Sequence, residues 1–122
     1  MNASEWLNAL RETARKPAIP ILSFPSVSIL GINVQELVSS EDLQAGGMKA
    51  ISERVPSGAA VSMMDLSVEA EAFGSAVRFD PMDVPAVTNI IVHNEAEARA
   101  LEVPSVGAGR TGLNISAIAK AA

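Results

Sequence analysis

Asp65 is the side chain of this sequence best placed for chemistry, because it directly follows an apolar run at residues 59–64. Proteins that alternate strands and helices place their functional groups at the carboxyl ends of strands. A carboxylate there can accept hydrogen bonds from N–H groups of a ligand or orient a neighbouring histidine. Aspartate is also a favoured N-cap, so Asp65 could instead begin the helix predicted after it. The sequence leaves both roles open, and the two are compatible.

The other titratable side chains carry weaker signals. Glu69 lies four residues after Asp65 and could share a helical face with it, but no fixed spacing marks Glu69 or Glu71 as its acid/base partner. His93 is the sole histidine and the chain has no cysteine, so no ligand set for a metal ion is recognisable. We therefore predict no metal site in this sequence and a structural or surface role for His93.

A glycine-rich stretch at residues 107–112 (GAGRTG) precedes the last predicted helix. Backbone N–H groups at a helix start could hold an anion there, with help from Arg110. The stretch lacks the Lys-Ser/Thr ending of a P-loop, and no strand clearly precedes it, as a dinucleotide-binding fingerprint requires. We interpret it as a flexible loop capped by Thr111.

Two short apolar runs, residues 18–24 and 59–64, are predicted to be the strands that position these groups. Prolines flank the first run, and Pro20 within it indicates an edge or strand-start position. Adjacent residues of a strand point to opposite faces. Met63 and Met64 are therefore interpreted as packing residues of the second strand rather than as a pair of ligands.

Helices are predicted between and around these strands from capping residues and apolar spacing. The first covers residues 2–14, begins at the capping residue Asn2 and buries Trp6, Leu7 and Leu10. The later helices are predicted over residues 26–30, 34–38, 41–54, 68–73, 94–101 and 113–122. A short exposed strand is predicted at residues 76–79, followed by a loop with Met82, Val87 and residues 90–92 packed under it.

The composition supports a globular α/β protein and excludes several classes of partner. Hydrophobic residues make up 48% of the 122 residues and aromatic residues only 3%, so aliphatic side chains must fill the core. The net charge of -5 argues against nucleic acid as a partner. No apolar run is long enough for a membrane span, and the start is polar, unlike a signal peptide. The expected location is the cytoplasm.

The order of these motifs resembles the start of the barrel of the uroporphyrinogen decarboxylase superfamily. The closest similarity is to its corrinoid branch, the methylcobalamin:coenzyme M methyltransferases. The resemblance rests on residues 20–24 (PILSF), 30–32 (LGI), the long helix to Arg54, residues 63–74 (MMDLSVEAEAFG) and residues 109–112 (GRTG). It implies an α/β fold in which residues 1–122 are the amino-terminal portion of a (β/α)8 TIM barrel. Residues 1–16 would form a leading helix, and residues 17–122 the first β/α units.

The resemblance also implies roles for residues near the ends of the two predicted strands. In the decarboxylases, an aspartate after the second strand binds the pyrrole nitrogens of the substrate, and Asp65 falls at that position. Asp65 is thus the candidate catalytic residue, and Phe24, Met64 and Asp65 are the candidate substrate-binding residues. The decarboxylases also use arginines after the first strand to hold carboxylates. Residues 24–30 (FPSVSIL) contain no arginine, which favours the methyltransferase branch.

Membership of that branch implies transfer of a methyl group from methylcobalamin to a thiol such as coenzyme M. The zinc and the corrinoid would be bound by the full barrel, since a barrel needs about 250 residues. We expect the 122-residue chain to be inactive alone and to self-associate through exposed apolar edges. The alternatives are a decarboxylase-like enzyme that acts on a tetrapyrrole, and a non-catalytic binding or assembly module.

Overall fold

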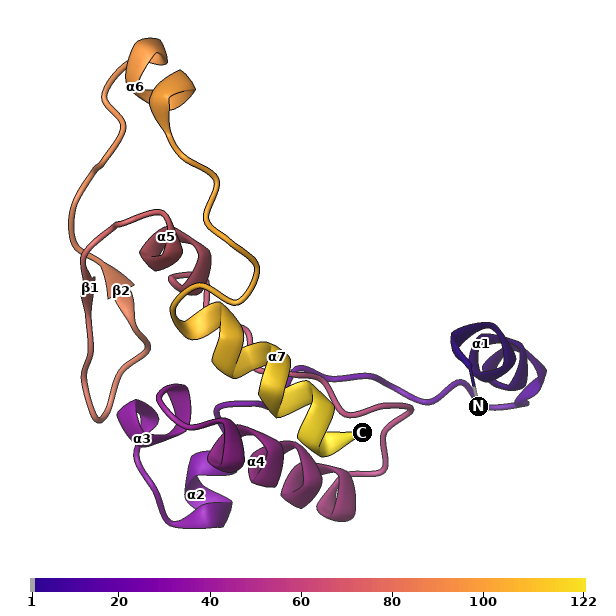
Figure 1. Cartoon of the computed structure of the whole chain (residues 1–122). Coiled ribbons are helices and arrows are strands. Elements are labelled where there is room, and N and C mark those ends of the chain that lie inside the picture. Colours follow the sequence, from indigo (N-terminus) through magenta and orange to yellow (C-terminus); the bar gives the residue numbers. More distant parts are fainter. Residues whose placement is uncertain (1) are drawn as a thin grey trace.

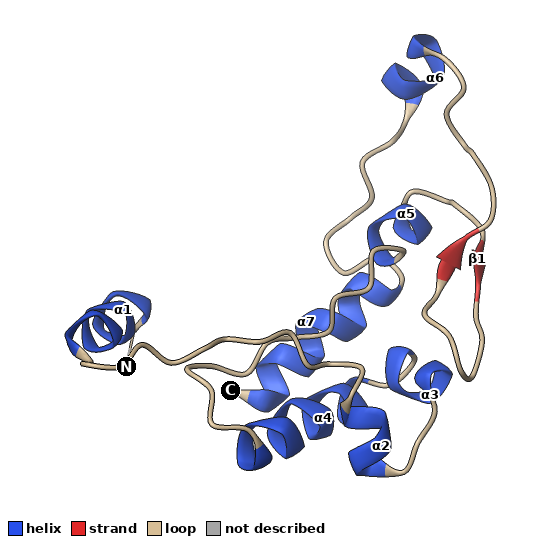
Figure 2. Ribbon diagram, turned by 180° about the vertical axis from the view of Figure 1, so that it is seen from behind, coloured by secondary structure: helices blue, strands red, loops and turns tan. Residues whose placement is uncertain are grey.

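Helices dominate the chain, which a computed structural model describes over residues 2–122 (Figure 1). In chain order they are α1 (Ala3–Glu12), α2 (Ser26–Leu30), α3 (Val34–Val38), α4 (Glu41–Arg54), α5 (Val68–Ala72), α6 (Glu95–Ala100) and α7 (Arg110–Ala121). Helices α2, α3, α4, α5 and α7 form the body, whereas α1 and α6 lie away from it in both views (Figures 1 and 2). Met1, the first residue of the predicted leading segment, lies outside the described residues.

Side-chain caps determine where four of the helices begin. Asn2, Asn33, Ser40 and Asn94 each accept a hydrogen bond from a backbone N–H in the first turn of the helix that follows. At the other end of α2, Gly31 adopts the left-handed conformation with φ of 68°. The corresponding predictions are confirmed to within one or two residues, because a cap is a local interaction that the sequence encodes directly.

The prediction of strands at residues 18–24 and 59–64 is wrong, because both segments are extended but form no regular strand. The two segments nevertheless lie side by side. Gly58 N–H donates to the Ala18 carbonyl at 2.9 Å near the start of both segments. Near their ends, Phe24 packs on the cluster that contains Met63. The segments therefore run in the same direction, as neighbouring strands of a β/α unit do. They lack the regular ladder of backbone hydrogen bonds that defines a sheet, and Pro20 has no N–H to contribute to one.

The only paired strands among residues 2–122 are β1 (Val77–Arg78) and β2 (Ala86–Val87), which form a short antiparallel hairpin (Figure 2). Val77 lies opposite Val87 in this hairpin. The predicted strand at residues 76–79 is thus present in shortened form. The described structure is helix-rich and compatible with the first units of a barrel, and it contains no barrel sheet.

The hydrophobic core lies where α3 meets the end of the second extended segment. Leu37, Val38 and Met63 are its buried members. The partly buried side chains packed around it are Phe24, Val27, Ile32, Val34, Leu43 and Phe79. The core therefore joins α2, α3 and α4 to the residues that immediately precede Asp65.

Close packing against α4 holds α2 and α7 in place (Figure 1). Gly47 lies at the contact with α2, where a Cβ atom would come within 2.6 Å of the Ser26 Oγ atom. On the side of α7, Lys120 forms ion pairs with Glu41 and Asp42 at the start of α4. Helix α4 is thus held in two ways. Gly47 allows α2 to approach closely, and the ion pairs of Lys120 connect α4 to α7.

Several predicted burials are wrong. Helix α1 contains no buried residue, and Leu7 is 46% exposed. In the hairpin and just after it, Met82, Val87 and Ile90 are exposed rather than packed under a loop. An apolar spacing predicts a face that can be buried, but a surface must be present to cover it.

Within residues 2–122, every helix is too short or too polar to cross a lipid bilayer.

Candidate functional site

Asp65 is buried at the carboxyl end of the second extended segment, with its side chain only 1% exposed. Its Oδ1 atom accepts two hydrogen bonds from Ser67, one from the backbone N–H at 2.9 Å and one from the hydroxyl at 2.6 Å. These bonds form the turn that leads into α5. Asp65 therefore shapes the start of that helix, as the capping alternative predicted, although Ser67 occupies the N-cap position itself.

Arg110 at the first position of α7 completes the environment of Asp65. Its Nη1 atom donates to Asp65 Oδ2, its Nε atom to Glu71 Oε2, and its Nη2 atom to Ser67 Oγ at 2.8 Å. The guanidinium carbon lies 4.8 Å from the centroid of the Phe79 ring, a cation–π contact. One arginine thus contacts two carboxylates, a hydroxyl and an aromatic face; we call Asp65, Ser67, Glu71 and Arg110 the ion cluster.

The ion cluster leaves Asp65 with little free hydrogen-bonding capacity. A carboxylate offers about four acceptor sites on its two oxygens. Ser67 uses two of them on Oδ1, and Arg110 uses one on Oδ2. About one acceptor site on Oδ2 has no partner among residues 2–122, and the side chain that carries it is only 1% exposed. The negative charge of Asp65 is balanced by Arg110, which it shares with Glu71.

Sequence reasoning missed this assembly. Arg110 was predicted to lie in a flexible loop, whereas it begins α7, three residues before the predicted start. Thr111, the predicted cap, is inside the helix, and its hydroxyl donates to the Ala108 carbonyl. Glu71 was not expected to meet Asp65, but both bind the same guanidinium. No local spacing could have revealed contacts that span 39 and 45 residues.

The glycines of the GAGRTG stretch explain how Arg110 reaches the cluster. Gly107 and Gly109 have positive φ angles of 84° and 55°, so the chain turns sharply before α7. A Cβ atom on Gly112 would come within 2.7 Å of the Gly107 carbonyl oxygen. The stretch is therefore a tight turn that directs Arg110 inward, and the side chain is engaged by carboxylates rather than turned toward an external anion.

The other two predicted substrate-binding residues lie in different surroundings. Phe24 packs against the core cluster, which contains Met63. Met64 is 51% exposed, so its predicted packing role is wrong, whereas the buried Met63 does pack. Phe79 connects the two environments, since it contacts the core and lies over Arg110. Met64 is thus the member of the predicted set whose side chain is accessible to a ligand.

His93 lies beside α6, far along the chain from the cluster, and is exposed as predicted. Its Nδ1 atom is 3.0 Å from Glu97 Oε2, which also accepts from the His93 backbone N–H at 2.7 Å. The backbone hydrogen bond, followed by the ring contact, lowers the pKa of Glu97 below its ordinary value of 4.5. Among residues 2–122, no three His, Cys, Asp or Glu side chains form a group that could hold a metal ion. The zinc implied by the resemblance therefore finds no ligand set in these residues.

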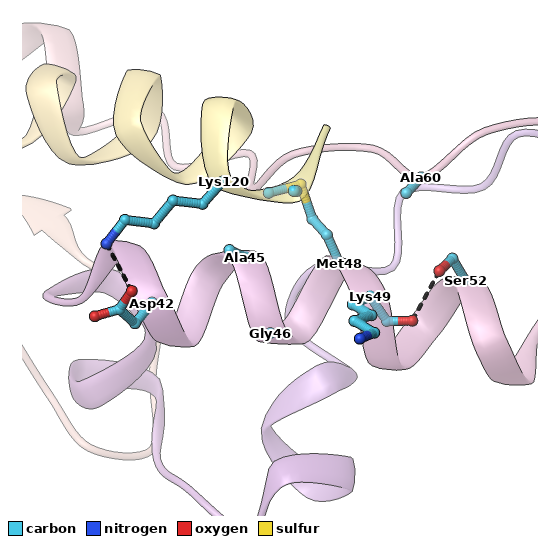
Figure 3. A pocket seen from close by; sticks show the side chains of 9 residues that line it. Asp42, Ala45, Gly46, Met48, Lys49, Ser52, Ala60 and Lys120 are labelled. Carbon is cyan, nitrogen blue, oxygen red and sulfur yellow. Dashed lines mark hydrogen bonds and ion pairs between the residues drawn. The ribbon is translucent and has the colours of Figure 1, made fainter.

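Two hollows differ in their relation to the ion cluster. One of about 340 Å³ lies between α4 and the end of α7, where Lys120 reaches Asp42 (Figure 3). It shares no lining residue with the cluster. The other, of about 220 Å³, lies beside the start of α7 and is lined by apolar groups of α5, α7 and the loop before α7, including Phe73, Val106 and Ile115. This apolar hollow is the one adjacent to the helices that carry Glu71 and Arg110.

A family model described as uroporphyrinogen decarboxylase (URO-D) matches residues 7–122, which is nearly the whole chain and includes the ion cluster. The chain belongs to the uroporphyrinogen decarboxylase family. This membership confirms the predicted superfamily and implies a TIM barrel as the family fold. No curated protein and no solved structure matches the chain significantly.

The position of Asp65 can be compared with the general arrangement of a TIM barrel. The residue follows the second of two adjacent extended segments that run in the same direction. In a barrel of this family, that end of the strands is the side on which active sites are built. The ion cluster follows the carboxyl ends of these two segments directly.

Proposed function

We propose that this chain contributes the Asp65 site of a corrinoid-dependent methyltransferase, which transfers a methyl group from methylcobalamin to a thiol such as coenzyme M. The observation that carries the proposal is the charge balance around Asp65. Its one arginine partner, Arg110, is shared with a second carboxylate, Glu71. The neighbouring hairpin repeats this arrangement, since Arg78 lies 3.6 Å from Asp80 and 3.5 Å from Asp83.

A substrate with many carboxylates would be poorly held by such surroundings. Both arginines are already compensated, and the segment after residue 24 supplies none. Bringing further negative charge next to Asp65 and Glu71 would cost electrostatic energy, most of all where water is excluded. A corrinoid carries mainly neutral amide side chains, so it avoids this repulsion. An amide N–H is also a suitable donor for the remaining acceptor site of Asp65.

The residues of this chain would act in binding and orientation. The half-exposed Met64 would contact the apolar surface of the macrocycle. Asp65, whose side chain is only 1% exposed, would accept a hydrogen bond from the macrocycle through its remaining Oδ2 site once that site is uncovered. Phe24 would support this surface from the core. Residues 2–122 provide no ligand set for zinc, so no step of thiol activation is assigned to them.

The second candidate is a decarboxylase-like enzyme that acts on a tetrapyrrole. Family membership and the position of Asp65 favour it, because a carboxylate at this position can accept hydrogen bonds from pyrrole N–H groups. It would need cations beyond the two compensated arginines to hold the substrate's carboxylates. A non-catalytic binding module is the third alternative.

The test uses the protein as expressed from its own gene, incubated with methylcobalamin and coenzyme M. We expect the visible spectrum to report loss of the methyl group only when the thiol is present. Asp65→Asn should lower the rate at least about tenfold, because the charged acceptor is lost. Asp42→Asn, a matched change at a carboxylate that is 79% exposed, should leave the rate unchanged.

Two outcomes would contradict the methyltransferase proposal. Decarboxylation of uroporphyrinogen without any demethylation of methylcobalamin would establish the second candidate. Inactivity toward both substrates, combined with binding of neither, would favour the non-catalytic module.

A further inference from the structure

Arg110 is the one side chain that contacts every other member of the ion cluster. We propose that Arg110 is a positioning residue, which fixes the orientation of the Asp65 carboxylate and thereby directs its remaining acceptor site. This inference rests on the proposed function, in which Asp65 binds the ligand. It assigns Arg110 no contact with the ligand itself.

The geometry of the guanidinium carries the first step of the argument. Three of its nitrogens donate to three different side chains, Asp65, Glu71 and Ser67. A guanidinium is planar and rigid, so these three contacts fix one orientation of the group. Its face lies over Phe79, which blocks movement out of that plane. Arg110 is only 7% exposed and so has little room for another orientation.

The second step concerns the carboxylate. Ser67 holds only Oδ1 of Asp65, whereas Arg110 holds Oδ2. With Ser67 alone, the carboxylate could turn about its single bond and change the direction of the free acceptor site. Contacts on both oxygens remove this freedom. The Ser67 hydroxyl strengthens the restraint, because it donates to Asp65 while it accepts from Arg110.

The third step is that Arg110 connects parts of the chain that are distant in sequence. Asp65 ends the second extended segment, Glu71 belongs to α5, and Phe79 follows β1, while Arg110 itself begins α7. Lysine could replace the charge, but its single ammonium group could not match the three planar contacts. The inference therefore predicts that charge alone is insufficient at this position.

The experiment compares Arg110→Lys and Arg110→Gln with the unaltered protein. The first measurement is exchange of the Ser67 backbone amide by NMR, since this N–H is bound to Asp65 Oδ1. We expect both variants to speed that exchange by about tenfold more than the exchange of the α4 amides, which reports any loss of overall stability. The second measurement is the Kd for methylcobalamin, which should rise by about the same factor.

Two further variants separate positioning from general stabilisation. Glu71→Gln keeps the contact between Arg110 and Asp65 and should leave the exchange of Ser67 unchanged. Arg99→Gln removes an exposed arginine whose pair with Glu95 is 77% exposed on both sides, and it should change neither measurement. If Arg110→Gln fails to fold, Arg110→Lys and Glu71→Gln still provide the comparison.

The outcomes distinguish failure of this inference from failure of the proposed function. Unchanged Ser67 exchange in Arg110→Lys and Arg110→Gln would overturn the positioning role, whatever the ligand. Equal acceleration in Arg110→Lys and Glu71→Gln would also overturn it, because the cluster would then act only through stability. Faster exchange of Ser67 in a protein that never binds methylcobalamin would support the positioning role and contradict the proposed function.

Discussion

The two extended segments, residues 18–24 and 59–65, are held together in different ways at their two ends. At the amino end, Gly58 donates one backbone hydrogen bond to Ala18, and the Trp6 side chain donates another to the Gly58 carbonyl at 3.2 Å. At the carboxyl end, the segments enter the hydrophobic core, and the ion cluster follows directly. The amino end thus has two isolated polar contacts, whereas the carboxyl end has a connected set.

The difference between the two ends shows how connected contacts restrict the arrangement of side chains. The two contacts at the amino end have only Gly58 in common, and the apolar side chains of Ile19 and Ile21 remain 43% and 52% exposed. In the ion cluster, each side chain has at least one partner that also contacts a third member. Buried polar groups that satisfy one another specify a single arrangement, and breaking one contact affects the rest. We therefore expect the end of the segments that carries the candidate site to be the more rigid one.

Loss of Arg110 should produce the largest effect on stability. Arg110→Gln leaves two carboxylates without a counter-charge, one of them on a side chain only 1% exposed. Breaking a buried pair in this way costs about 3–5 kcal/mol of unfolding free energy. Urea denaturation would measure it. The double variant Asp65→Asn/Arg110→Gln should recover part of the loss, and strict additivity of the two single changes would argue against direct coupling.

The next largest effect should be self-association of the chain through the amino end of the two extended segments. Ile19 and Ile21 present apolar surface there without a covering element. We expect light scattering on the 122-residue chain to show masses above the monomer value of 12.7 kDa that increase with concentration. Ile19→Glu and Ile21→Glu should shift the mass toward the monomer, whereas Gln35→Glu should not. A monodisperse monomer of the unaltered chain would refute the expectation.

Replacing Trp6 should have a smaller effect. Trp6→Phe removes the hydrogen bond to Gly58 but keeps an aromatic ring, and α1 buries no residue. We expect a loss of no more than about 1.5 kcal/mol, the usual range for one such bond. The urea midpoint would report it. A loss as large as that of Arg110→Gln would mean that both ends contribute equally to stability.

The pH dependence contributed by Lys120 should be the smallest effect. Hydrogen bonds to Asp42 and then to Glu41 raise the pKa of Lys120 above its ordinary 10.5, and the bond from Lys120 is the main cause that lowers the pKa of Glu41 below 4.5. The stabilisation from Lys120 is complete below pH 10.5 and is lost as the pH rises through the folded value. That from Glu41 is complete above pH 4.5 and is lost as the pH falls.

The test is the urea midpoint of the protein across the pH range. We expect a plateau between the two ordinary pKa values, 4.5 and 10.5, with a slight decline on each side. Lys120→Gln should reduce both declines, because Glu41 and Asp42 both lose Lys120, the partner that they share. Lys49→Gln, at another lysine of the same hollow, should reduce neither (Figure 3). Equal effects of the two variants would mean that the ion pairs at Lys120 are not the cause.

The candidate site was only partly predictable. Asp65 could be singled out because its position after an apolar run is visible in the sequence, and its role in ligand binding stays a prediction. Arg110 and Glu71 could not be assigned to the site from the sequence. Even the contact between these two residues spans 39 positions of the chain. Phe24 and Met64 remain predictions as ligand contacts, one packed beside the core and the other exposed.

The sequence by itself determined the local structure of this protein. Caps such as Asn33 and Ser40 act within one turn of helix, and Gly31 ends α2 by its own conformational freedom, so these boundaries follow from neighbouring residues. Only the tertiary structure decided which apolar faces are covered and which charges meet. Those outcomes depend on surfaces and partners from distant parts of the chain, as the inward turn of Arg110 toward Asp65 shows.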